Sequence, residues 1–225
     1  MKYEWVLFDA DDTLFHFDAF KGLVLMFSRY GVEFTTQDFA AYQVVNHQLW
    51  IDYQDGKINA QTLQNTRFEA WAERLSVTTQ ELNLAFLSAM ADICQFMPGA
   101  ENLLKALSQH AKLGIITNGF SALQRVRLER MKVESYISVL VISEEVGVAK
   151  PDPKIFECAF EMMDYYEKHK ILMVGDNAQS DILGGQNIGI DTCWLNTKNL
   201  PLPENVSPTH IVSQLYELQA LILPS

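Results

Sequence analysis

Polar residues follow several short apolar runs of this sequence, at the points where the strands of a sheet would end. They supply carboxylates, hydroxyls, an amide and an amine: Asp9, Asp11, Thr13, Thr117, Asn118, Lys150, Asp176 and Asp181. In an open parallel sheet, ligands bind outside the carboxyl ends of the strands, which meet at one edge. We therefore expect these side chains, distant in sequence, to gather in one site.

A site of this composition needs a divalent cation. Carboxylates crowded together repel each other by roughly 4 kcal/mol per close pair at an effective dielectric constant near 20. Oxygen ligands that leave room for water suit Mg²⁺, so the expected metal site consists of Asp9, Asp176 and the backbone carbonyl of Asp11. Asp181 then lies behind the direct ligands. Mn²⁺ and Co²⁺ are substitutes that the sequence does not distinguish from Mg²⁺.

The two acids after the first apolar run fit the catalysis of phosphate transfer. Asp9 would attack phosphorus and form an acyl phosphate, which divides one difficult hydrolysis into two easier displacements. Asp11 would act as general acid and then general base, with its pKa raised by the neighbouring carboxylates. Taken singly, both acids also suit a simple turn after a strand. Thr13 either supports the turn by hydrogen bonding or takes a direct part, and we assign no chemistry to Asp12.

Lys150, Thr117 and Asn118 are the expected substrate-binding residues, because preorganised donors stabilise the oxygens of a phosphoryl group in transfer. Each also has a plain structural interpretation. Asn118 with Gly119 is a favoured turn pair, and a lysine before Pro151 is usually solvated. The companion acids favour the functional interpretation, because this edge of the sheet offers no other cation to balance them.

The elements that would position these residues alternate between strand and helix after residue 98. Strands are expected at 5–8, 113–116, 139–142, 171–174 and 190–194, and helices near 101–109, 123–131, 154–163 and 182–187. This alternation predicts an α/β fold with parallel strands and right-handed crossovers. Residues 18–94 instead show helical spacing, with helix-start signals at Thr35 with Asp38 and Thr78 with Glu81. We expect four helices there and no strand.

The motifs together resemble those of the haloacid dehalogenase-like hydrolases, in the same order and over nearly the whole chain. They are Asp9-x-Asp11-x-Thr13, Thr117-Asn118-Gly119, Lys150-Pro151, and Gly175-Asp176 followed by Asp181. The resemblance implies a Rossmann-like core of open parallel sheet formed by residues 1–16 and 95–225. It also implies an all-α cap domain, residues 17–94, inserted after the first strand.

Within that superfamily, the chain is similar to the pyrimidine 5′-nucleotidases in length and in the stretches 9–13 and 117–121. This similarity implies a Mg²⁺-dependent phosphatase that hydrolyses nucleoside monophosphates through a phosphoaspartate. The helical insert carries many aromatic residues, most of which we expect to form its core. Phe17 and Phe120, each close behind a motif, are the candidates to stack against a base.

Several alternatives stay open. A sugar-phosphate phosphatase or a phosphosugar mutase would use the same acids. A dehalogenase would not need Asp11 or the acidic cluster, and a phosphonatase would need a lysine from the insert, which contains only Lys21 and Lys57. From another class, a phospho-accepting receiver module is about half this size and has no helical insert. A non-catalytic scaffold is disfavoured because every expected catalytic position is filled.

The bulk composition narrows the partners. The 225 residues are 48% hydrophobic and carry a net charge of −11, which disfavours nucleic acid and acidic membranes as partners. A small-molecule phosphate monoester remains the expected partner, and the oligomeric state stays undetermined. Three cysteines without a pairing pattern, and the lack of an apolar leader or membrane span, favour a cytoplasmic protein.

Overall fold

The computed structural model describes residues 1–223, and contacts divide them into two compact units. The sheet unit comprises Met1–His16, Gln95–Gly119 and the described chain from Leu128 onward. The helical unit comprises Phe17–Cys94 and Phe120–Arg127. The sequence placed residues 120–127 in the α/β core, whereas their contacts group them with the helices. The domain division made from the sequence itself stays a prediction.

Six parallel strands form the sheet of the first unit. They are β1 (Trp5–Phe8), β2 (Lys112–Thr117), β3 (Ile137–Ile142), β4 (Ile171–Gly175), β5 (Asp191–Leu195) and β6 (His210–Val212). Their order is β3-β2-β1-β4-β5-β6, so the predicted α/β fold with an open parallel sheet is confirmed. The chain runs outward from β1 through β2 to β3 and then returns beside β1 as β4. This reversal makes the β1–β4 boundary the switch point at which such sheets bind ligands.

Both central strands are apolar because both faces of the sheet are covered. Every residue of Trp5–Phe8 is buried, and so is every residue of Ile171–Gly175. Strands buried on two faces show continuous apolar runs rather than alternation. The same apolar runs made these strands recognisable from the sequence.

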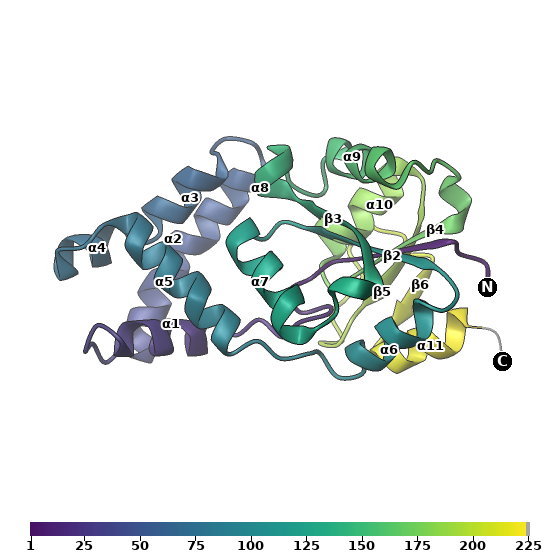
Figure 1. Ribbon diagram of the computed structural model, residues 1–225. Coiled ribbons are helices and arrows are strands. Elements are labelled where there is room, and N and C mark those ends of the chain that lie inside the picture. The colour runs from purple at the N-terminus through teal and green to yellow at the C-terminus, as the bar shows by residue number, and fades with distance from the viewer. Residues whose placement is uncertain (224–225) are drawn as a thin grey trace. The chain divides into compact units, whose positions relative to one another are not determined.

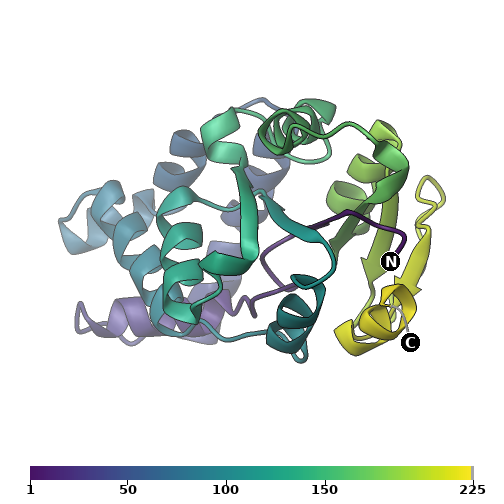
Figure 2. The ribbon, with the colours of Figure 1, turned by 45° about the vertical axis from the view of Figure 1, so that its right-hand side comes forward.

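Helices cover the two faces of the sheet (Figure 1). The helices α6 (Ala100–Leu107) and α11 (Leu215–Ile222) lie on one face, and α9 (Pro153–Met163) and α10 (Leu183–Ile188) on the other. In the turned view of Figure 2, α11 lies beside β6, the strand that forms one side edge of the sheet. Ile155, Phe156 and Phe160 of α9 pack into the core beneath β1 to β4.

The loops contain short helical segments that the sequence did not predict. They are η1 (Glu134–Tyr136), α8 (Ser143–Val146), η2 (Lys168–Lys170) and the π-helical turn η3 (Ala178–Ile182). The turn η3 leads directly into α10, so this helical stretch begins four residues before the expected start at 182. Asn177 caps it by accepting hydrogen bonds from the backbone N–H groups of Gln179 and Ser180.

The helical unit contains five helices within residues 17–94, so the expectation of four was wrong. They are α1 (Ala19–Ser28), α2 (Thr36–Gln54), α3 (Ala60–Thr66), α4 (Glu69–Leu75) and α5 (Thr79–Asp92). Neither glycine nor proline marks the break between α3 and α4. Arg67 and Phe68, the two residues at the break, are both buried. Consecutive side chains of one helix point about 100° apart, so the break turns both of them inward.

The helix starts in this unit follow the local signals in the sequence. Thr35 accepts a hydrogen bond from the Asp38 N–H at 3.2 Å, and Thr78 accepts one from the Glu81 N–H at 3.1 Å. In both capping boxes the acid also accepts from the backbone of the threonine. Both predicted starts, of α2 and α5, are therefore confirmed.

Aromatic side chains fill the interior of the helical unit, as expected. The rings of Phe27 and Phe34 are stacked with centroids 4.7 Å apart, and Trp71 lies 4.3 Å from Phe27. The helix α7 (Ser121–Met131) begins in this unit and ends in the sheet unit. Among the described residues, no helix has the length and apolar character needed to cross a membrane.

Candidate active site

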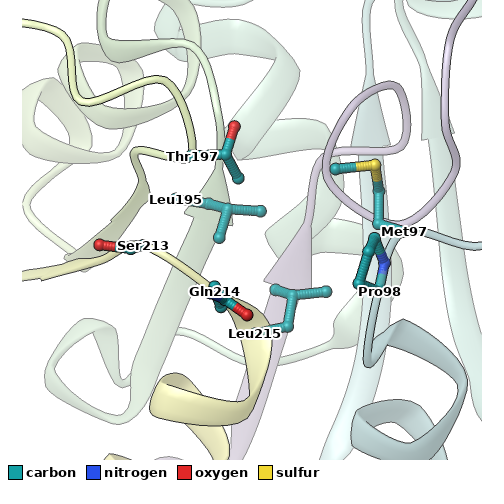
Figure 3. Close-up of a pocket in the computed structure, with 7 residues that line it drawn as sticks. All are labelled: Met97, Pro98, Leu195, Thr197, Ser213, Gln214 and Leu215. Carbon is teal, nitrogen blue, oxygen red and sulfur yellow. The ribbon is translucent and has the colours of Figure 1, made fainter.

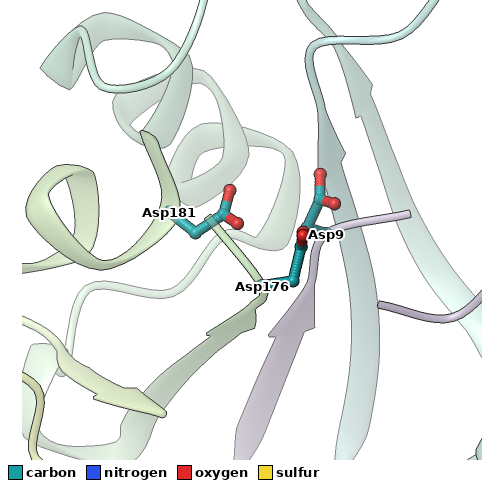
Figure 4. A group of neighbouring side chains, drawn as sticks. All are labelled: Asp9, Asp176 and Asp181. Atoms are coloured by element: carbon teal, nitrogen blue, oxygen red, sulfur yellow. The ribbon is translucent and has the colours of Figure 1, made fainter. Parts of the chain in front are cut away.

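The neighbouring strands β1 and β4 deliver two acids to the same edge of the sheet. Phe8 is in register with Val174, and the Asp9 N–H donates to the Val174 carbonyl at 2.8 Å. Asp9 therefore lies beside Gly175, and Asp176 follows directly. One carboxylate oxygen from each of Asp9, Asp176 and Asp181 lies within 4.8 Å of the others (Figure 4).

Lys150 brings a positive charge to these acids. Its Nζ donates to Asp9 Oδ1 at 2.7 Å, forms an ion pair with Asp181 Oδ1 at 2.7 Å, and donates to the Ile116 carbonyl at 2.6 Å. The side chain is 1% exposed, so these three acceptors replace water around the ammonium group. The ammonium is thus fixed between an acid that follows β1 and an acid in η3.

Asn118 and Thr117, the expected phosphate ligands at the end of β2, make internal hydrogen bonds in this structure. Asn118 accepts from the backbone N–H of Lys150 at 2.7 Å and donates to its carbonyl at 3.0 Å. The hydroxyl of Thr117 accepts from the Gly119 N–H at 3.0 Å. Asn118 therefore fixes the backbone from which Lys150 reaches the acids, a contact that the sequence did not predict.

The loop after β1 is tied to the loop after β4 by Thr13. Its buried hydroxyl accepts from the Asp176 N–H at 3.1 Å and donates to Asp176 Oδ1 at 3.4 Å. This contact favours the hydrogen-bonding role considered for Thr13. Asp11 is half-buried in the same loop, where its backbone bridges to Phe15, and Asp12 adopts a positive φ of 56°.

Asp181 is held from several sides. Its Oδ1 accepts from the Ser180 hydroxyl at 3.2 Å besides pairing with Lys150, and its Oδ2 accepts from the Asn177 N–H at 3.0 Å. Gly175 makes this position available, because a Cβ at Gly175 would lie 2.1 Å from Asp181 Oδ2. Both carboxylate oxygens of Asp181 thus contact protein groups. This agrees with the expectation that Asp181 supports the metal site without binding the metal ion directly.

Burial and mutual repulsion shift the pKa values of these acids. Burial raises the pKa of Asp9 well above its usual range; Lys150 opposes the shift, while Asp181, Asp176 and Asp11 add to it. Burial and the charge of Asp181 raise the pKa of Asp176 to about 7. Burial alone would lower the pKa of Lys150, but Asp181 and Asp9 outweigh it and raise that pKa.

This charge distribution fits a divalent cation. Three clustered carboxylates face one ammonium group, so the ionised cluster keeps a negative surplus. Asp9 and Asp176 offer the oxygen ligands that Mg²⁺ prefers, and a bound dication would lower both raised pKa values. The donor set of this edge therefore fits a magnesium ion.

Sequence reasoning missed several groups that support the site. The Ile116 carbonyl accepts from Lys150, Ser180 donates to Asp181, and the Trp194 indole N–H donates to the Asp176 carbonyl at 2.8 Å. Ser180 is adjacent to a motif residue and offered a weak signal. For Trp194, the only signal in the sequence was its position near the end of β5, the strand next to β4. A backbone carbonyl such as that of Ile116 gives no signal in the sequence.

A cavity of about 360 Å³ opens in the sheet unit, near the start of α11 (Figure 3). It is lined by Met97, Pro98, Leu195, Thr197, Ser213, Gln214 and Leu215. None of these side chains carries a charge or titrates near neutral pH. The cavity therefore contributes no acid, base or metal ligand to the chemistry of the site.

Comparison with known proteins agrees with this geometry. A family model described as haloacid dehalogenase-like hydrolase matches residues 3–189. A pyrimidine 5′-nucleotidase of Escherichia coli (strain K12) is 56% identical over 222 residues, covering 99% of both chains. A pyrimidine 5′-nucleotidase of Streptococcus pneumoniae is 35% identical, covering 99% of this chain and 94% of the relative.

The fold has a solved counterpart of the same extent. A crystal structure of a putative HAD-hydrolase from Bacillus subtilis, described as bound to magnesium, has a TM-score of 0.86 and 30% identity. The match covers 99% of both chains. The family model and the full-length relatives lead to one conclusion: this chain belongs to the haloacid dehalogenase-like hydrolases.

Proposed function

We propose that this chain is a Mg²⁺-dependent phosphatase that hydrolyses pyrimidine nucleoside monophosphates to nucleoside and phosphate. One observation carries the phosphatase proposal: Lys150 Nζ lies 2.7 Å from both Asp9 and Asp181, next to Asp176. The ammonium group of Lys150 favours the ionised form of the Asp9 carboxylate for attack on phosphorus, beside acids that can hold a dication. The choice of substrate is supported by two full-length relatives described as pyrimidine 5′-nucleotidases.

Asp9 is the proposed nucleophile. Its carboxylate attacks phosphorus, the bond to the nucleoside oxygen breaks, and an aspartyl phosphate forms. Lys150 favours the ionised form of Asp9, because an ammonium group at 2.7 Å opposes the rise in pKa caused by burial. Lys150 also places positive charge where negative charge develops on the phosphoryl oxygens.

Asp11 is the proposed general acid and base. It protonates the departing nucleoside oxygen, and as a carboxylate it then takes a proton from the water that attacks the aspartyl phosphate. This second displacement regenerates Asp9 and releases inorganic phosphate. Thr117 and Asn118 are the proposed donors to the phosphoryl oxygens, which requires that they exchange or share their present internal hydrogen bonds.

The proposed metal ligands are Asp9, Asp176 and the backbone carbonyl of Asp11. Bound Mg²⁺ supplies positive charge that offsets the repulsion between the nucleophile and the phosphate dianion. Thr13 and Trp194 hold Asp176 by hydrogen bonds, which keeps this ligand in place. Mn²⁺ and Co²⁺ remain proposed substitutes, because the same oxygen ligands accept both ions.

We also propose a cytoplasmic location and a small-molecule substrate rather than nucleic acid or a membrane. Within residues 1–223, Cys94, Cys158 and Cys193 form no disulfide bond, as is usual in a reducing compartment. The net charge of −11 opposes binding to polyanions. Cell fractionation with an antibody to the intact chain tests the location.

A phosphate-release assay tests the proposed activity. The panel contains uridine, thymidine, cytidine and adenosine monophosphates, with ribose 5-phosphate and a hexose phosphate, each with Mg²⁺ or with a chelator. We expect pyrimidine nucleotides to be the best substrates and the chelator to abolish activity. Preference for a sugar phosphate would refute the nucleotidase assignment, and an inactive wild type in Mg²⁺ would refute the phosphatase assignment.

Three matched variants test the residue roles. Asp9→Asn is expected to reduce phosphate release to background, and Asp11→Asn to reduce it by about 10²- to 10⁴-fold, the usual contribution of general acid–base catalysis. Asp12→Asn makes the same change one residue further along and tolerates the positive φ of that position. It is expected to retain activity, and a loss equal to that of Asp11→Asn would contradict the assignment of Asp11.

A further inference from the structure

Lys198 brings a second positive charge to the carboxyl edge of the sheet. It lies three residues beyond the end of β5, and its Nζ is 4.0 Å from Asp12 Oδ2, in the loop that follows β1. The strand β4 lies between β1 and β5, so this ion pair spans the end of β4, which Asp176 follows. The expectation that this edge carries no cation besides Lys150 is therefore wrong.

The turn that carries Lys198 is closed by a side chain. Asn196 donates from Nδ2 to the Leu200 carbonyl at 2.9 Å and accepts from the Leu200 N–H at 2.9 Å. Its own backbone N–H donates to the Val212 carbonyl of β6 at 2.8 Å. Asn199 adopts a φ of 56°, which asparagine tolerates better than most residues. The backbone of Lys198 is therefore fixed to the sheet, while its side chain is 67% exposed.

The charge of Lys198 reaches the proposed metal site. Burial and the charge of Asp181 raise the pKa of Asp176, and the positive charge of Lys198 is among those that oppose the rise. Coulombic interactions weaken with distance and are screened by solvent, so this ammonium group lies near the place where Mg²⁺ would bind. A cation in that position attracts anions and repels other cations.

Lys198 and Lys150 differ in what their charges can attract. Lys150 is 1% exposed and contacts both Asp9 and Asp181, so these two acids balance its charge. The ion pair of Lys198 is exposed, and such pairs are weak, so an incoming anion can compete for the ammonium group. The chain as a whole carries a net charge of −11, which repels a phosphate dianion. Lys198 opposes this repulsion beside the metal site.

We propose that Lys198 draws the phosphate group of the substrate from solvent toward the metal site. The inference rests on the proposed phosphatase function and adds the turn after β5 to the elements that bind substrate. At roughly 8 Å and the dielectric constant of water, one ammonium group raises the local concentration of a dianion about fivefold. Salt removes most of this gain, because the Debye length falls from about 30 Å at 0.01 M to about 3 Å at 1 M.

The kinetics of Lys198→Met with uridine 5′-monophosphate test this attraction. In Mg²⁺ at about 0.01 M ionic strength, we expect kcat/KM to fall about fivefold below that of the wild type, with kcat within about twofold. The difference in kcat/KM should vanish near about 1 M salt. Lys105→Met is the matched control, because it removes the same charge from an exposed lysine near the end of α6, which leads to the opposite edge of the sheet. It should leave kcat/KM within about twofold of the wild-type value at both salt concentrations.

Calorimetric titrations test the same charge without catalysis. Metal-free Lys198→Met should bind Mg²⁺ about two- to fivefold more tightly than the wild type, because a cation near Asp176 has been removed. With saturating Mg²⁺, the same variant should bind inorganic phosphate about fivefold more weakly. A distorted site would bind both ions more weakly, so opposite changes identify charge as the cause. Lys198→Arg keeps the charge and should keep both affinities within about twofold of the wild-type values.

Each outcome decides the inference. Equal salt dependence of kcat/KM in the wild type and Lys198→Met would overturn the proposal, as would equal effects of Lys198→Met and Lys105→Met. Weaker binding of both ions to Lys198→Met would show a structural role for the turn and overturn it as well. A wild type inactive on every monophosphate would instead refute the proposed function, and the two titrations would still support or overturn the attraction of phosphate by Lys198.

Discussion

Replacing Lys150 with methionine should strongly destabilise the metal-free protein. The change removes the ammonium group but keeps a long apolar side chain at a position that is 1% exposed. It leaves Asp9 and Asp181 buried without their shared cation. Breaking a buried ion pair by removing one partner typically costs about 3–5 kcal/mol, because the remaining charge is uncompensated.

The distances support a cost in that range. At 2.7 Å and an effective dielectric constant near 20, each of the two pairs contributes about 6 kcal/mol of attraction before desolvation is subtracted. The remaining acids avoid part of the penalty by binding protons. For a chain of 225 residues, about 3–5 kcal/mol corresponds to a fall in Tm of roughly 6–20 °C.

Thermal unfolding in a chelating buffer measures the effect, and Lys57→Met is the matched control. Lys57 also contacts two aspartates, Asp55 at 2.8 Å and Asp52 at 3.4 Å, but its side chain is 60% exposed. Exposed ion pairs are screened by water and contribute little to stability, so the Tm of Lys57→Met should fall by no more than a few degrees. Excess Mg²⁺ should restore part of the stability of Lys150→Met, because a dication also screens the acids.

Equal Tm values for the two lysine variants would refute this reasoning. They would mean that the charges of Asp9 and Asp181 are compensated by something other than Lys150. A Tm of Lys150→Met that rises in the chelating buffer would have the same consequence.

Three further perturbations follow from the geometry. Gly175→Ala places a methyl group 2.1 Å from Asp181 Oδ2. The substitution should lower the free energy of unfolding by about 1–3 kcal/mol and weaken Mg²⁺ binding in a calorimetric titration. Wild-type values for both quantities would contradict the contact. Thr35→Ala removes a capping box and should cost about 1 kcal/mol in urea unfolding, whereas Thr35→Ser should cost much less; equal losses would exclude the cap. The pKa of Asp176 rises from 3.8 to about 7 on folding, so the folded protein holds this proton more tightly than the unfolded chain does. The resulting contribution to folding stability is complete below about pH 4 and is lost as the pH rises through 7. The Tm of the metal-free protein should therefore decrease as the pH is raised from about 5 to 8, and the decrease should be smaller in Asp176→Asn. Identical curves of Tm against pH for the two proteins would contradict this assignment.

Local signals account for the parts of the fold that were predicted correctly. The central strands are short apolar runs, and the starts of α2 and α5 are marked by threonine and acid three residues apart. Both signals act over a few residues, so they can be read without knowing the rest of the chain. The break between α3 and α4 has no such signal, because it depends on the simultaneous burial of Arg67 and Phe68.

The sequence by itself determined which chemical groups the sheet unit carries and that they follow its strands. Only the tertiary structure decided their partners. Lys150 reaches Asp9 across 141 residues of chain, and Asn118 binds the backbone of Lys150 rather than standing free. The grouping of Phe120 with Trp50 and Arg67 in the helical unit was equally hidden. Contacts of this kind depend on strand order, register and side-chain packing, which arise when distant segments meet and leave no local pattern.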